Sequence, residues 1–328
     1  PQLATVAAAV PLIWWLPGPE VALVLAWIQA IAAVAVSHAI ARTPYRVGFD
    51  RIIIRRFLSF GWPIMLSALP VLVVYQGDRM IVGAFLGVEP LAKYTTAFLI
   101  ALVPGALAAK AALSIMLPLL ASVGKDRAAL ASRFALMSEV MVLIAGFYLV
   151  GLTFLGGHLV AIAFGPAYAG AGVLTAALAL MWSLRMIQSP AGALLMAIGN
   201  TKPLFVASLI RACSLALTLM VAWAGGDVVL LAVSGAFGEF LSLGYVGWKM
   251  SKIDQRFGNV VASRSAMLAS AALLMSAAMY WRLIDQPLHL AAAAVALLLP
   301  ALAIAAGLIM PGLRSELRQF INHRLHTA

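Results

Sequence analysis

The sequence predicts an all-α, polytopic integral membrane protein with about ten transmembrane helices. Hydrophobic residues make up 64% of the 328 residues and charged residues only 10%, and the mean hydropathy is +1.04. A soluble domain of this size carries about 25% charged residues. The apolar runs are close to the ~20 residues that a membrane-spanning helix needs, and they lack the alternating pattern of barrel strands.

Ten apolar segments follow one another along the chain, and each is bounded by polar or charged residues. The first is the shortest and weakest of the ten, whereas the others are long enough to cross the bilayer as one helix. The predicted helices cover residues 3–17, 20–41, 59–87, 91–121, 134–156, 168–198, 203–223, 228–248, 265–284 and 288–310.

The basic residues fall in alternate loops. Most of the 22 Lys and Arg lie in residues 42–56, 125–133, 202, 249–264 and 314–324. The positive-inside rule places all of these segments on the cytoplasmic side. We therefore expect both ends of the chain to be cytoplasmic, with only short loops on the outer side.

Several functional classes do not fit this composition. The net charge of +11 is spread over separate loops, not gathered on the solvated patch that nucleic acid requires. The outer loops are too short to assemble a catalytic constellation, so we expect no enzyme activity. The single Cys213 and the scattered histidines predict no metal site and no cofactor. The chain begins with Pro1 and has no charged leader, which indicates a fragment or a trimmed product.

Motifs in the middle of the chain resemble a known transporter family. The segments are Phe60-Gly61-Trp62-Pro63, Asp78-Arg79-Met80-Ile81-Val82-Gly83, Leu86-Gly87-Val88-Glu89-Pro90-Leu91-Ala92-Lys93-Tyr94, Phe164-Gly165-Pro166-Ala167-Tyr168 and Ala197-Ile198-Gly199-Asn200. Together they are similar to the second half of bacterial polysaccharide flippases, which belong to the multidrug/oligosaccharidyl-lipid/polysaccharide exporter superfamily. Ala92 departs from the glycine that the family usually has before the tyrosine.

The resemblance implies two six-helix lobes around a central cavity, and it divides this chain into five parts. Residues 1–41 would be the last two helices of a truncated first lobe, and 42–58 a basic amphipathic linker on the inner leaflet. Residues 59–250 would form the complete second lobe, 251–310 two additional helices, and 311–328 a basic cytoplasmic tail.

Charged residues inside the predicted helices are the candidate cargo-binding groups, because a charge in hydrocarbon costs roughly 2.5–3.5 kcal/mol and usually faces a protein-lined cavity. Polar stripes flank three of them: Gln188 and Ser189 beside Arg185, Ser208 and Ser214 beside Arg211, and Gly235 and Ser242 beside Glu239. The candidate residues are Arg185, Arg211, Lys110, Arg79, Asp78 and Glu239.

A structural explanation of these charges stays open. Glu239 would then pair with Arg211 or Arg185, and Asp78 and Arg79 would cap each other. Glu139 lies near the cytoplasmic end of its predicted helix, so we expect it to reach Arg133 or water.

The predicted function is a flippase that moves an undecaprenyl-pyrophosphate-linked oligosaccharide across the bacterial cytoplasmic membrane for polysaccharide biosynthesis. The arginines supply guanidinium groups suited to a diphosphate, and the resemblance supplies the mechanism. Expected partners are this substrate, membrane lipids, and a polysaccharide polymerase or glycosyltransferases. The alternatives are a cation-coupled multidrug exporter of the same superfamily and a non-transporting scaffold of a glycan assembly complex.

Overall fold

The computed structural model describes residues 2–15, 18, 20–41, 50–124, 126–280, 286–310, 312 and 314. These residues form ten α-helices, one 3₁₀ turn and no strand, which confirms the all-α class. The elements are α1 (Gln2–Trp15), α2 (Glu20–Ile40), α3 (Arg51–Leu86), α4 (Val88–Ala121), α5 (Arg127–Phe164), η1 (Pro166–Tyr168), α6 (Gly172–Ala197), α7 (Lys202–Trp223), α8 (Val228–Ile253), α9 (Gln255–Tyr280) and α10 (Leu288–Ile309).

Seven of the described helices are long and apolar enough to cross a membrane: α2, α3, α4, α5, α7, α8 and α10. The chain is therefore a multi-pass membrane protein. Helix α1, with 14 residues, is shorter than a bilayer crossing requires. Helix α6 is less apolar because it carries the polar stripe around Arg185, and most of its side chains are buried.

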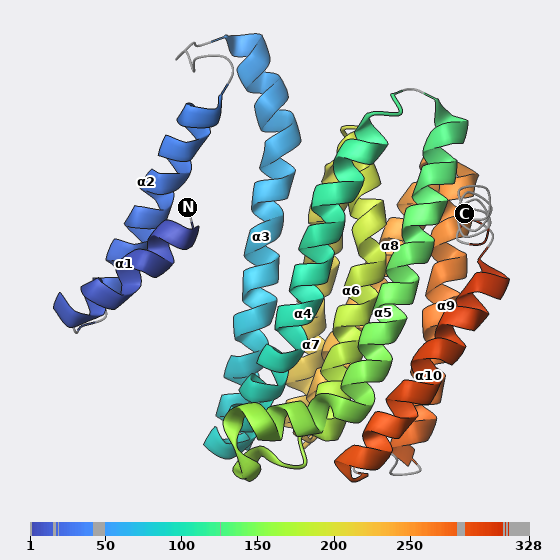
Figure 1. Ribbon diagram of the computed structural model, residues 1–328. Helices are drawn as coiled ribbons and strands as arrows, with labels where there is room; N and C mark the ends of the chain where they lie inside the picture. The colour runs from blue at the N-terminus through green and yellow to red at the C-terminus, as the bar shows by residue number, and fades with distance from the viewer. Residues whose placement is uncertain are drawn as a thin grey trace, which may run out of the picture. The chain divides into compact units, whose positions relative to one another are not determined.

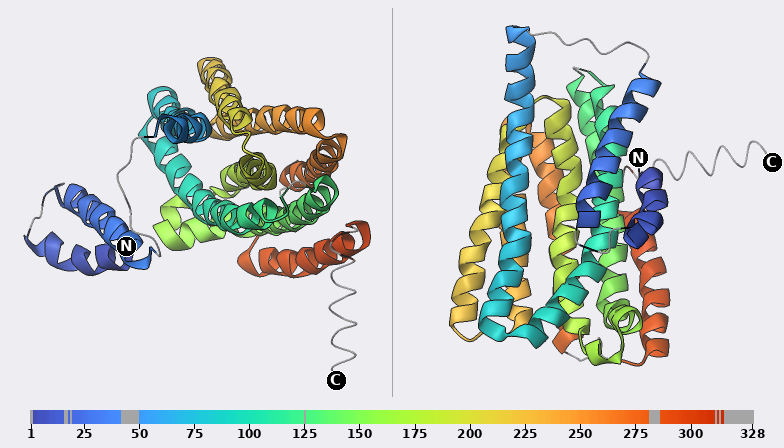
Figure 2. Two further views of the ribbon diagram at one scale, coloured as in Figure 1. Left: turned by 90° about the horizontal axis from the view of Figure 1, so that it is seen from above. Right: turned by 90° about the vertical axis from the view of Figure 1, so that its left-hand side faces the viewer.

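The chain divides into two compact units, Pro1–Arg56 and Phe57–Ala328. In the first unit α1 packs against α2. The larger unit is a bundle in which α6 lies in the middle, in contact with α4, α5, α8 and α9, as seen from above in Figure 2. Figure 1 shows these helices side by side, with α10 against α5 at the rim.

Glycines set the closest helix crossings in the larger unit. A Cβ at Gly157 of α5 would lie 2.9 Å from the backbone Cα of Gly172 in α6, and one at Gly238 of α8 would lie 2.4 Å from the Ser214 side chain of α7. Because lipid tails are as apolar as the helix surfaces, helix association in membranes depends on such close packing of small residues.

Polar and conformational signals in the sequence explain where several helices begin and end. Asp126 accepts hydrogen bonds from the backbone N–H groups of Ala128 and Ala129, and so caps α5. Gly87 and Gly165 have φ values of 91° and 101°, a region that favours glycine. Both glycines belong to the motifs that resemble the flippase family. Part of the resemblance is therefore explained by turns that require glycine.

Several helices extend beyond their predicted bounds, among them α9, which begins at Gln255 and not at residue 265. Helix α3 begins at Arg51, so residues 51–58 of the predicted linker form its first turns, while linker residues 42–49 lie outside the described residues. Helix α5 runs from Arg127 to Phe164 and not from 134 to 156, because the polar turn around Arg133 continues the helix. The predicted tail, 311–328, lies outside the described residues except for Gly312 and Arg314.

Candidate functional site

Three of the six candidate charges meet in one buried network. Glu239 of α8 is 1% exposed and accepts from two arginines of different helices. The Arg211 Nε of α7 lies 2.6 Å from the Glu239 Oε2, and an Arg185 Nη of α6 bonds the other carboxylate oxygen. Both arginines are thus held by one carboxylate, and this arginine–glutamate cluster carries one net positive charge.

Uncharged polar groups of the predicted stripes complete the cluster. Arg211 Nη2 donates to Gln188 Oε1 at 3.0 Å and lies 3.4 Å from the Ser242 hydroxyl. Gln188 Nε2 in turn donates to Ser242 Oγ at 3.3 Å. The ion pairs and the hydrogen bonds of Gln188 and Ser242 together hold α6, α7 and α8 in a fixed register. A shift of one helix would leave buried polar groups without partners, which is costly.

Two aromatic residues that the sequence analysis did not single out enclose the Arg185 guanidinium. Its Cζ lies 5.1 Å from the ring centre of Tyr75 and 4.7 Å from that of Trp182, and Arg185 also donates to the Tyr75 hydroxyl. These distances are within cation–π range. Trp182 stands three residues before Arg185, so helical spacing could have identified it; Tyr75, on α3, required the tertiary structure.

Asp78 and Arg79 form a second group on α3 and do not cap each other in the described contacts. Asp78 is 4% exposed and accepts from the Tyr94 hydroxyl of α4 at 3.4 Å. The Arg79 guanidinium lies over the Phe98 ring, 4.9 Å from its centre, and its Nε is buried without a hydrogen-bond partner among the described atoms. The two neighbours on α3 therefore use different partners on α4.

Lys110 is exposed on α4 and takes no part in the arginine–glutamate cluster. Within the described part of the chain no carboxylate lies within ion-pair distance of it. The residues around it on that face, such as Leu99, Val103 and Leu107, are exposed and apolar. The structure thus separates Lys110 from Arg185, Arg211 and Glu239.

The expectation for Glu139 is wrong. Its side chain is 1% exposed and pairs with Arg264 Nη2 of α9 at 2.7 Å, while Arg133 bonds the Leu119 carbonyl and the Ser122 hydroxyl. The longer α5 explains the error, because Glu139 lies more than three turns from the true helix start. The ion pair joins α5 to α9.

The buried groups of the site are rich in hydrogen-bond donors. Arg185 Nε and Trp182 Nε1 are buried without an acceptor among the described atoms. Such donors are rare in native proteins, and they are chemically suited to phosphate or carbonyl oxygens. In the described part of the chain, no three His, Cys, Asp or Glu side chains are grouped to hold a metal ion.

Comparison with known proteins identifies the family. The family described as "Polysaccharide biosynthesis protein" matches residues 1–173, more than half of the chain. No curated protein and no solved structure matches. The matched range includes Asp78, Arg79 and Lys110, whereas all residues of the arginine–glutamate cluster lie beyond it. The match agrees with the resemblance carried by the motifs between Phe60 and Tyr168, and the chain belongs to the polysaccharide biosynthesis protein family.

Proposed function

We propose that the protein is a flippase, not an enzyme, that moves a lipid-linked oligosaccharide across the bacterial cytoplasmic membrane. Its cargo would be an undecaprenyl-pyrophosphate-linked saccharide supplied by glycosyltransferases on the inner face and used by a polymerase on the outer face. The family supports a role in polysaccharide synthesis or export. The orientation, with both ends cytoplasmic, rests on the distribution of Lys and Arg.

The observation that carries this proposal is the unbalanced charge of the arginine–glutamate cluster. Two guanidinium groups share one carboxylate, and two N–H donors beside them, Arg185 Nε and Trp182 Nε1, lack acceptors among the described atoms. A cluster with a surplus of positive charge and donors favours an anionic, oxygen-rich group such as a sugar diphosphate. Its aromatic walls, Tyr75 and Trp182, are suited to a sugar ring as well as to the guanidinium.

Lys110 adds a further positive group within the membrane span. It lies about 8 Å along the helix axis from the midpoint of α4, so its position falls inside a hydrocarbon core about 30 Å thick. An exposed ammonium at that depth is stable only beside water, an anion or the membrane interface. We assign this face of α4 to the hydrated path along which the polar part of the cargo moves.

The two alternatives predict other chemistry. A cation-coupled drug exporter would use buried carboxylates toward a cationic cargo, whereas two arginines outnumber the glutamate in the arginine–glutamate cluster. A non-transporting scaffold requires intramembrane charges that are all neutralised, and Lys110 has no ion-pair partner among the described residues. The charge balance therefore favours an anionic cargo.

Replacement of Lys110 tests the proposal without disturbing a buried contact, since its side chain is exposed. Lys110→Gln should make the lipid-linked precursor accumulate on the cytoplasmic leaflet and reduce surface polysaccharide, while Lys110→Arg should retain most of the activity. The measurement is leaflet-specific labelling of the precursor in cells whose own copy of the gene is deleted.

The matched control is Lys93→Gln, because the Lys93 side chain is 38% exposed but lies near the start of α4, paired with Glu89 at 2.9 Å. This control should leave surface polysaccharide at the normal level. Normal export by Lys110→Gln, with the protein present in the membrane at normal amount, would remove Lys110 from the path.

A further inference from the structure

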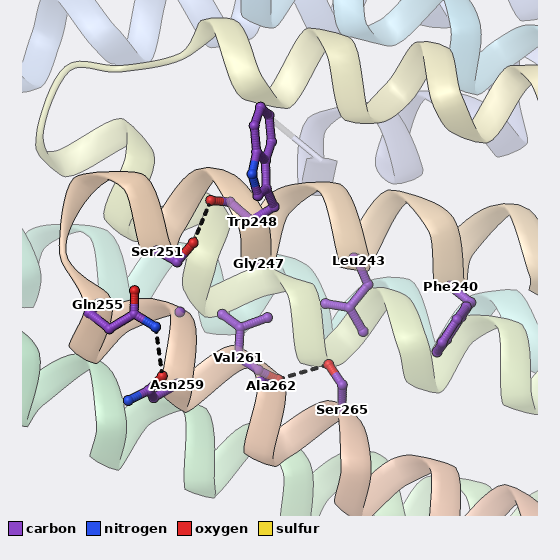
Figure 3. A pocket seen from close by; sticks show the side chains of 12 residues that line it. Phe240, Leu243, Gly247, Trp248, Ser251, Gln255, Asn259, Val261, Ala262 and Ser265 are labelled. Carbon is purple, nitrogen blue, oxygen red and sulfur yellow. Dashed lines mark hydrogen bonds between the residues drawn. The ribbon is translucent and has the colours of Figure 1, made fainter.

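A groove between α8 and α9 lies outside the cluster described above. It has a volume of about 340 Å³, within the range of about 300–1,000 Å³ that is typical of ligand sites. Figure 3 shows the side chains that line it, with Trp248 on one wall. Gly244 contributes open space to the groove, because a Cβ placed there would meet no atom within 4 Å.

The lining of the groove changes from apolar to polar along its length. One end is formed by Phe240 and Leu243 with Ser265, whose hydroxyl already donates to the Val261 carbonyl, and the other by the polar side chains of Gln255 and Asn259; Val261 lies between the two ends (Figure 3). This change from hydrocarbon-like to hydrogen-bonding walls matches an amphiphile more closely than it matches a uniformly polar or uniformly apolar ligand.

The polar end keeps hydrogen-bonding capacity for a ligand. Gln255 Nε2 donates to Asn259 Oδ1 at 3.2 Å, and both residues are exposed, so their other amide groups are accessible. The Ser251 hydroxyl donates to the Trp248 carbonyl at 2.8 Å, which leaves its oxygen free to accept. Amides and a hydroxyl at a helix corner are typical headgroup contacts, since they can both donate and accept.

The charge at this end is positive. The Asp254 carboxylate is neutralised by Arg256, whose guanidinium donates to it at 2.8 Å and 3.1 Å. These hydrogen bonds hold the pKa of the Asp254 carboxyl below its usual value. Lys249 and Lys252 then remain in excess. The Lys249 ammonium lies 4.4 Å from the centre of the Trp248 ring, so one of these charges lies against a side chain that lines the groove.

We infer that the groove between α8 and α9 binds an anionic glycerophospholipid. The phosphate lies at the end with Lys249, Lys252 and the exposed amides, and one acyl chain lies along Phe240 and Val261. Basic residues beside a membrane helix attract anionic headgroups. A second protein helix in the groove would need a carboxylate to meet the same two lysines, whereas the lipid brings its own negative charge. This site is independent of the flippase proposal.

Filling the groove provides the first test. Gly244→Leu adds a side chain into open space and replaces glycine by a better helix former, so the variant should fold. Gly307→Leu is the matched control, since a Cβ at Gly307 of α10 would also meet no atom within 4 Å. The full chain is purified from mixed phosphatidylglycerol and phosphatidylcholine, and the retained lipid is counted by native mass spectrometry.

Wild type and Gly307→Leu should each retain phosphatidylglycerol, and Gly244→Leu should lose it. Ala262→Leu fills the groove from its α9 side and should lose phosphatidylglycerol in the same way. It replaces Gly244→Leu as the test if that variant aggregates. Equal retention by the wild type and by a folded groove-filling variant would overturn the site.

The charge at the groove provides the second test. Replacing both Lys249 and Lys252 by Gln should lower the preference for phosphatidylglycerol over phosphatidylcholine, by roughly fivefold for each lysine. No preference in the wild type would overturn the anionic assignment. A further outcome would also overturn the lipid site. If cross-linking captured a dimer of the wild type without retained lipid, and no dimer of Gly244→Leu, a second copy of the chain would occupy the groove.

Discussion

Glu239 is the residue on which the arginine–glutamate cluster depends most strongly, and replacing it should cost more stability than replacing either arginine. Glu239→Gln keeps the shape of the side chain but leaves two buried guanidinium groups without their carboxylate. Breaking a buried ion pair from one side typically costs about 3–5 kcal/mol, and here both arginines lose their partner at once.

Arg211→Gln is the informative comparison. It leaves Arg185 and Glu239 as a neutral pair, while the bonds from Arg211 to Gln188 and Ser242 are lost. Unsatisfied buried polar groups cost about 1–3 kcal/mol. The difference of about 2 kcal/mol between the two variants corresponds to about a thirtyfold difference in the ratio of unfolded to folded protein.

Heating in detergent followed by size-exclusion chromatography with fluorescence detection measures this difference as the temperature at which folded protein is lost. Glu89→Gln is the control, because Glu89 is 81% exposed in its pair with Lys93 and exposed pairs contribute at most about 1 kcal/mol. If Glu239→Gln proved as stable as Arg211→Gln, the carboxylate would not be the shared centre of the cluster.

Two further perturbations test the packing of the larger unit. Gly157→Ala should lower the melting temperature, because its Cβ would lie 2.9 Å from the backbone of Gly172. Gly151→Ala is the control and should leave the melting temperature unchanged or raise it, because its Cβ would meet no atom within 4 Å. Equal melting temperatures of the two variants would contradict the close crossing of α5 and α6. Arg264→Met should destabilise the protein by about 3–5 kcal/mol, because it removes the cation 2.7 Å from Glu139. Adding Glu139→Gln should recover part of this loss of stability. No recovery in denaturant titrations would show that the two side chains do not interact.

The sequence predicted helices and polar stripes well because both depend on spacing within one segment. Hydropathy identified the long apolar runs, and helical periodicity placed Gln188 on the face of Arg185 and Ser242 on that of Glu239. Both residues belong to the arginine–glutamate cluster in the structure.

Partners on different helices could not be predicted in the same way. Periodicity orients each helix but does not set the register between helices, so it left open whether Glu239 pairs with Arg185 or Arg211; the structure pairs it with both. Tyr75 was missed because its contact with Arg185 spans 110 positions. Glu139 was misplaced because the polar first turns of α5 were not counted as helix.

The central claim is that α4 presents Lys110 to a hydrated transport path, and thiol labelling at this position tests it most directly. Cys213 is the native cysteine and is exposed, so Lys110→Cys is made in a Cys213→Ser background, with Ile304→Cys, an exposed apolar position of α10, as the control. Thiols react as thiolates, which require water. We predict that a charged, membrane-impermeant thiol reagent labels Lys110→Cys rapidly. Labelling only by a membrane-permeant reagent, at the rate of Ile304→Cys, would place Lys110 in lipid and contradict the proposed path.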